Sequence, residues 1–359
     1  MQDQNAPDKP PHGWPWTWIN PRAITTASGV SEDVVLAMAL FDDILGVMSS
    51  LLEQHQVRSP IYKYIIPGLT SYGWFGGSAG YLEDKSGYAV AVEAGSSLQI
   101  FFALVRLMAG PSTFPSLKSV RQVELVEPVG LPLLPRPGEK EFRWIGHSNL
   151  KSPNLLQDRK LNLNLRILHS HALTYLFLHE ISHVVQGHLE YCSKAKRRAL
   201  QLPPNEYETF MKHEIQPLEF LADQHALGFG ALQIVSAIWG GPDFAEKHAS
   251  AIEHLTLFGT AAGIVSLLFE QYSGQSYSHP PASHRAMYIQ AAGHIKIPDL
   301  DLSHDEIRRA LDDGLNQATH AWDALGWPRS RNLPDDVDAF IDRIWKVDSQ
   351  CIRPKKPPG

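Results

Sequence analysis

Residues 176–185 read Leu-Phe-Leu-His-Glu-Ile-Ser-His-Val-Val, an apolar run that carries His179, Glu180 and His183. Residues four apart lie on the same face of a helix, so the two histidines can direct their imidazoles at one point. Two neutral imidazoles in this arrangement suit a zinc ion, and a glutamate between them can lie beside the water that such an ion binds. We therefore predict an active-site helix with His179 and His183 as metal ligands and Glu180 as general base.

A zinc ion held by two histidines needs a third protein ligand, with the fourth position left for water. Glu219 lies in the apolar run 218–221, near the start of the next predicted helix. A carboxylate in such a setting is expected to be buried and to need a partner, which makes Glu219 the candidate third ligand. Asp223 follows one turn later on the same face and is expected to accept a hydrogen bond from a ligating imidazole.

A third motif, His-Pro-Pro-Ala-Ser-His-Arg, occupies residues 279–285. A histidine brought to the cleft from this separate segment can donate a hydrogen bond to the developing oxyanion of a hydrated peptide bond. We assign that role to His279, with His284 as its rival, although a lone histidine before two prolines is more often a turn residue. Arg285 is expected to fix the segment by pairing with a carboxylate, Asp223 being one candidate.

In order and spacing, these motifs resemble the gluzincin peptidases of the HtpX and CaaX-prenyl-protease group. The matching residues span 174–285 and include His-Glu-x-x-His, Glu-x-x-Ala-Asp, and His-Pro-Pro with an arginine six residues after the histidine. The resemblance implies zinc bound by His179, His183 and Glu219, with Glu180 as general base. By position it also implies supporting roles for Asp223, His279 and Arg285.

Two departures from that family pattern stand out. Ser182 occupies a position where the family usually has glycine, and this exchange of one small residue for another is expected to be harmless. The membrane-spanning helices of the best-known members are absent, so their substrates do not transfer to this chain. A weaker resemblance, of general shape only, links the chain to the Lit-type phage-exclusion peptidases, which are also His-Glu-x-x-His proteins.

The remaining histidines are given no ligand role. A metzincin-type third ligand would stand six residues beyond His183, where the chain has Leu189. His188 would also lie on the opposite side of a continuous helix from His179, so we expect a surface or second-layer histidine there. The same reading is given to four further histidines: His169, His171, His213 and His225.

The composition is that of an ordinary soluble protein, with 359 residues, 43% of them hydrophobic and 19% charged. A net charge of −6 gives no basic surface for nucleic acid. Only two cysteines occur, far apart, which indicates a reducing compartment. The longest apolar stretch, residues 255–269, is shorter than the roughly 20 residues of a membrane-spanning helix. We expect a cytoplasmic protein without a membrane span.

The patterning predicts a mainly α fold with a small β-sheet (α+β) and, by the resemblance, a zincin-like catalytic domain. Helices are expected at residues 31–54, 97–108, 171–188, 217–239, 244–271, 303–325 and 335–347. Strands are expected at 88–92 and 119–126, an edge strand at 161–167 and a glycine-rich loop at 68–80. Residues 1–150 form a region of unknown role, a lid or a recognition module. The catalytic domain spans 151–300 and a helical extension 301–359.

The predicted function is a soluble zinc-dependent metallopeptidase in which Glu180 takes the proton of the attacking water. The edge strand 161–167 would align an extended protein or peptide substrate by β-addition. A regulated effector protease, silent until a partner or signal opens the cleft, fits the same residues. The alternative is a non-catalytic sensor or structural zinc module. A closed structural site would need a fourth protein ligand, however, and would have no use for Glu180.

Overall fold

The computed structural model describes residues 10–25, 32–57, 59–70, 75–109, 159–238, 244–272, 302–327, 329 and 337–357. It is mainly helical with one three-stranded sheet, as predicted. The α-helices are α1 (Pro21–Thr25), α2 (Glu32–His55), α3 (Ala94–Ala109), α5 (Arg159–Val185), α6 (His188–Ala199), α7 (Pro204–Ile238), α8 (Phe244–Tyr272), α10 (His304–Ala324) and α11 (Val337–Asp348). A 3₁₀ helix, Pro60–Tyr64, precedes the strands β1 (Ile65–Thr70), β2 (Gly77–Tyr81) and β3 (Tyr88–Glu93).

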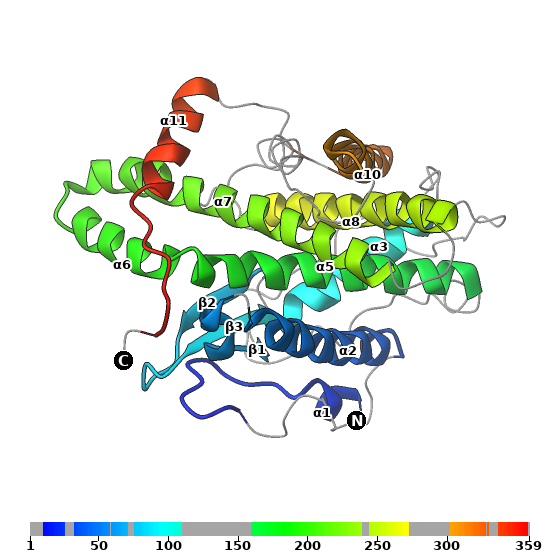
Figure 1. Ribbon diagram of the computed structural model, residues 1–359, viewed down its shortest axis with the longest axis horizontal. Coiled ribbons are helices and arrows are strands. Elements are labelled where there is room, and N and C mark those ends of the chain that lie inside the picture. The colour runs from blue at the N-terminus through cyan, green and yellow to red at the C-terminus, as the bar shows by residue number, and fades with distance from the viewer. Residues whose placement is uncertain are drawn as a thin grey trace.

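Helix α5 runs through the middle of the molecule (Figure 1). It packs against α7 and α8 on one side and against α2, α3 and the sheet on the other. Leu165, Leu168, Ala172 and Leu176, three or four residues apart, are wholly buried in one continuous core. This helical spacing of apolar residues fixes which face of α5 is buried, and it leads directly to the motif that begins at His179.

The edge strand predicted at 161–167 is wrong, because these residues form the first turns of α5. The alternation of Leu and Asn at 161–165 matches a strand, but five residues are too few to distinguish a period of 2 from part of a helical pattern. Leu165 is buried and Leu163 is 57% exposed, which places them on different sides of the helix. The helix predicted at 171–188 accordingly begins earlier, at Arg159, and ends at Val185.

The sheet has the order β1–β3–β2, with β3 parallel to β1 and antiparallel to β2. The strand predicted at 88–92 is confirmed as β3, whose residues are all buried. The loop predicted at 68–80 is wrong where the structure describes it, since residues 68–70 end β1 and residues 77–80 are most of β2. Two of its glycines are strand positions that face indole rings. A Cβ at Gly68 would lie 2.5 Å from the Trp14 ring and 2.4 Å from the Trp18 ring, and a Cβ at Gly80 would lie 3.2 Å from the Trp16 ring.

Most helix predictions are confirmed to within a few residues, namely those of α2, α3, α8, α10 and α11. Ser303 and Glu306 form a capping box at the start of α10. Helix α7 differs, because it begins at Pro204 and Pro217 lies inside it. The buried Ile215 and Leu218 pack in the same cluster on either side of this proline, which holds the helix together where one backbone hydrogen bond is missing.

Some predictions lie outside the described residues, including the strand at 119–126. The three-part domain division stays a prediction. Two described helical segments, Val35–His55 and His248–Tyr272, are long and apolar enough to span a membrane. The most apolar 18-residue stretch is 50% buried in the first segment and 78% buried in the second, and the burial of the second is that of a core helix.

Lowering the pH from 7.5 to 4.5 is expected to destabilise the fold partly through His169. This wholly buried imidazole contacts Ser97 of α3, with Nε2 3.0 Å from the backbone oxygen. Burial lowers its pKa from 6.5 to about 4, despite the hydrogen bond with Ser97. The folded state therefore holds His169 neutral, while the unfolded chain takes up a proton below pH 6.5. The contribution of His169 to the unfolding free energy is thus fully present above pH 6.5 and is lost as the pH falls toward 4.

This lowering of the His169 pKa corresponds to a loss of about 3 kcal/mol of unfolding free energy on acidification. Urea unfolding of the wild type and of a His169→Gln variant at both pH values measures the effect. The variant should lose less unfolding free energy on acidification than the wild type. Equal losses in the two proteins would contradict the assignment.

Candidate metal centre

Three side chains from α5 and α7 converge on one point. The Nε2 atoms of His179 and His183, one turn apart on α5, lie 3.2 Å from each other. The Glu219 carboxylate reaches them from α7, with Oε2 3.2 Å from His179 Nε2 and Oε1 3.7 Å from His183 Nε2. All three residues are at most 8% exposed, and they form a group that could hold a metal ion, here called the metal cluster. The structure thus brings together the three ligands predicted from the sequence.

The distances suit a tetrahedral ion. Two nitrogens bound at 2.0–2.1 Å with tetrahedral angles would lie about 3.3 Å apart. Two imidazole nitrogens and a carboxylate also leave one of four positions for water or substrate, which is the donor set of catalytic rather than structural sites. The residues therefore fit a catalytic metal ion.

Asp223 supports the first ligand from α7, one turn beyond Glu219. Its Oδ1 lies 2.8 Å from His179 Nδ1 and accepts a hydrogen bond from the Tyr175 hydroxyl at 2.6 Å. Although burial opposes the charged imidazole, the Asp223 and Glu219 carboxylates raise the pKa of His179 to about 10. With Nε2 on a metal, Nδ1–H donates to Asp223 and the ring orientation is fixed. Tyr175 was not anticipated from the sequence, although it lies one turn before His179.

The Glu180 side chain reaches from α5 to β2 at the edge of the sheet. A Cβ atom at Gly77, the first residue of β2, would lie 2.5 Å from Glu180 Cγ and 2.8 Å from Glu180 Oε1. A glycine at position 77 therefore leaves room for the Glu180 side chain, which is 6% exposed. The structure places the predicted general base beside a sheet edge that sequence reasoning had treated as loop.

Ser182, at the position where the resembled family usually has glycine, makes two hydrogen-bonding contacts through its hydroxyl. Its Oγ donates to the Leu178 backbone oxygen at 2.5 Å and lies 2.8 Å from Nδ1 of His225 on α7. Burial lowers the pKa of His225 to about 4, so its imidazole is neutral at physiological pH. This contact joins α5 to α7 next to the metal cluster, a role that sequence analysis had not given to either residue.

The position of His188 differs from the one that the periodicity of a continuous helix predicts. This residue is fully buried, and its Nδ1 lies 3.0 Å from Nδ1 of His183. Burial and the neighbouring His183 lower the pKa of His188 well below its usual value. Of the two positions expected for it, surface or second layer, the structure shows the second. The argument from a continuous helix failed because α5 ends before His188.

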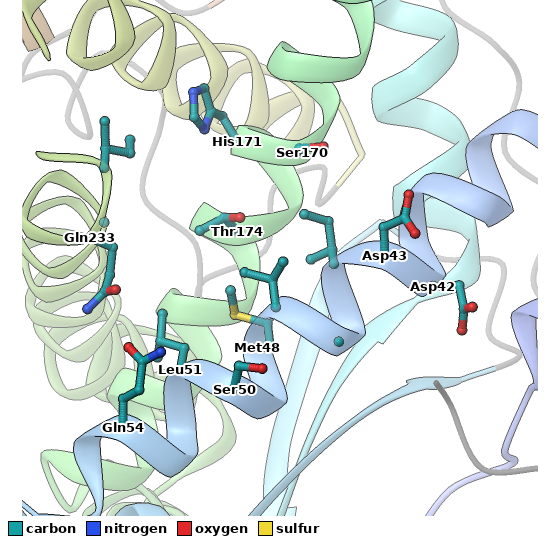
Figure 2. Close-up of a pocket in the computed structure, with 15 residues that line it drawn as sticks. Asp42, Asp43, Met48, Ser50, Leu51, Gln54, Ser170, His171, Thr174 and Gln233 are labelled. Atoms are coloured by element: carbon teal, nitrogen blue, oxygen red, sulfur yellow. The ribbon is translucent and has the colours of Figure 1, made fainter. Parts of the chain in front are cut away.

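A separate cavity of about 580 Å³ lies farther along α5, where this helix meets α2 and α7 (Figure 2). Thr174 and His171 of α5 and Gln233 of α7 contribute to its wall, but none of the metal-cluster residues does. The His171 ring lies 5.8 Å from those of His254 and Phe258 on α8. The cavity is therefore distinct from the metal cluster.

The third motif, with His279, His284 and Arg285, lies outside the described residues, so their roles stay predictions. The two cysteines are poor nucleophile candidates. Burial raises the thiol pKa values of Cys192 and Cys351 to about 12.

Residues 133–300 match the family model described as Peptidase U49, a segment that contains the metal cluster of α5 and α7. The match shows similarity to a peptidase family of Lit type, the weaker of the two resemblances seen in the sequence, and the comparisons do not confirm the HtpX and CaaX-prenyl-protease resemblance. Neither a curated protein nor a solved structure matches the chain.

Proposed function

We propose that the protein is a zinc-dependent metallopeptidase of gluzincin type. The observation that carries the proposal is the convergence of His179, His183 and Glu219, with Glu180 at the same turn of α5. The family match over residues 133–300 supports peptide-bond hydrolysis as the reaction. Two imidazoles and one carboxylate with an open position favour zinc among the common metals.

When bound, zinc would polarise the scissile carbonyl and lower the pKa of water toward neutrality. Glu180 would accept the proton of the attacking water and return it to the leaving nitrogen. His179 and His183 would hold the ion, with Asp223 keeping the His179 ring in place through Nδ1. We retain His279 as the donor to the developing oxyanion, with His284 as its rival and Arg285 in support.

We further propose that β2 aligns the substrate, in place of the strand once expected at 161–167. β2 ends the sheet, and among the described strands only β3 pairs with it. An extended peptide could add to such an edge through backbone hydrogen bonds. The contact between Gly77 and Glu180 would place that peptide beside the general base.

Replacing Gly77 with alanine is expected to lower kcat/KM by about 10²-fold, because a displacement of about 1 Å at a catalytic group costs that much. The added Cβ would lie 2.5 Å from Glu180 Cγ, so the Glu180 side chain must move. Zinc content should not change. Gly80→Ala is the matched control on the same strand, since its Cβ would face Trp16 at 3.2 Å. Equal activity of the two variants would contradict the placement of Glu180.

Peptide cleavage with and without metal tests the proposal as a whole. The purified chain is incubated with a diverse peptide mixture, and new termini are identified by mass spectrometry. We expect cleavage that a zinc chelator abolishes and added zinc restores. A chain that binds zinc but cleaves nothing, and behaves the same as Glu180→Gln, would favour the non-catalytic module.

We propose that the enzyme is cytoplasmic and that its substrate is a protein or peptide. We also propose that a regulatory partner controls its activity. The burial of the apolar stretch of α8, at 78%, supports a core helix rather than a membrane span there, whereas the corresponding stretch of α2 is 50% buried. Cell fractionation tests the location, and recovery with the membrane fraction after a salt wash would contradict it. Activity that appears only in cell extract would support control by a partner.

A further inference from the structure

The chain changes direction at the junction of α5 and α6, immediately after the metal-binding motif. Gly187 adopts φ +81°, a left-handed conformation that favours glycine, and α6 begins at the next residue. A Cβ at Gly187 would also lie 2.1 Å from the backbone oxygen of Ile352, which belongs to the C-terminal segment. Because of this turn, His188 does not continue around α5 but folds back onto His183.

If His183 binds a metal, the donor and the acceptor of the hydrogen bond between the His183 and His188 rings are fixed. His183 Nε2 faces His179 and Glu219, so the lone pair on Nε2 is the one available to an ion. The proton of a neutral His183 then sits on Nδ1, which must donate to Nδ1 of His188 at 3.0 Å. His188 is accordingly the acceptor, and its own proton sits on Nε2.

We propose that His188 is a positioning residue for the metal site, which holds the His183 ring with Nε2 directed at the ion. The inference rests on the proposed metal function and adds a residue to it. His188 would serve His183 as Asp223 serves His179, through the nitrogen that does not bind the metal. Such outer partners typically change metal affinity by 10- to 100-fold.

The burial of His188 supports this role. The side chain is fully buried, and its Nε2 has no hydrogen-bond partner among the described residues. Burying an imidazole with one nitrogen unsatisfied costs stability, and an apolar side chain would avoid that cost. Among the described residues, its hydrogen-bonding contact is the one with His183, so orientation of a metal ligand is the function the contact can supply.

Zinc affinity of the full-length chain, measured by competition with a chromophoric chelator, tests the inference. His188→Leu keeps an apolar side chain in the space but removes the acceptor, and should weaken zinc binding by about 10- to 100-fold. His188→Asn can place its Oδ1 near the position of Nδ1, and should restore affinity close to that of the wild type. His169→Leu is the matched control, a buried histidine on α5 away from the metal cluster.

Melting temperatures of the metal-free proteins separate positioning from folding. Wild-type affinity in His188→Leu would overturn the inference. So would loss of affinity in both His188 variants and in His169→Leu, in step with their melting temperatures, because that pattern shows a purely structural role. A wild type that binds no zinc would contradict the proposed metal function itself. A wild type that binds zinc, together with a His188→Leu variant that binds it equally well, would contradict only the role of His188.

Discussion

Replacing Glu180 with glutamine is expected to lower kcat by about 10²- to 10⁴-fold on any peptide that the wild type cleaves, with zinc still bound. Glutamine has the same shape as glutamate but its amide cannot accept the proton of the attacking water. The side chain is 6% exposed and lies against Gly77, so the isosteric change should leave the packing between α5 and β2 intact.

Steady-state kinetics and zinc stoichiometry of the same preparations measure this effect. Glu190→Gln is the matched control, since Glu190 is an exposed carboxylate that pairs with Lys194 on the surface of α6. The control should retain wild-type kcat. Full activity in Glu180→Gln would remove the general-base role, and loss of zinc would show that the residue is needed to form the site.

The second large effect is expected from Glu219→Ala, which removes the ligand that α7 contributes. Apparent binding free energies of structural zinc sites, roughly 10–16 kcal/mol, correspond to about 3 kcal/mol for each of four ligands. Zinc affinity should therefore fall by about 10²-fold or more, and hydrolysis should be lost under conditions that leave the variant metal-free. Elemental analysis after dialysis and chelator competition give the two measurements.

Glu214→Ala is the control for this change. Glu214 lies on the same helix and is bonded to Arg198 and Tyr191 rather than to the metal cluster. Its replacement should leave zinc affinity unchanged. If Glu219→Ala holds zinc as tightly as the wild type, the third ligand is another residue.

The candidate ligands could be singled out from the sequence because their patterns are local. His179 and His183 needed only the four-residue spacing of a helix, and Glu219 needed only an apolar setting that makes a buried carboxylate seek a partner. Asp223 followed from its position one turn later. The structure shows each of these contacts.

What sequence reasoning missed depends on where the chain turns and on which segments meet. The role of His188 required knowing that Gly187 breaks the helix, and a glycine directly before it was the one available signal. The strand β2 was not recognised because of Gly77 and Gly80, which accommodate the Glu180 side chain and the Trp16 ring. Alternation at 161–165 indicated a strand because a short window cannot show the longer helical period that controls α5.

The central claim is that His179, His183 and Glu219 together hold the catalytic metal ion. The most direct test is a crystal structure of the zinc-loaded chain with anomalous diffraction recorded at the zinc absorption edge. The account predicts one strong peak, about 2.0–2.2 Å from both Nε2 atoms and from the Glu219 carboxylate. No peak at this point, or a zinc ion held by other residues, would contradict it.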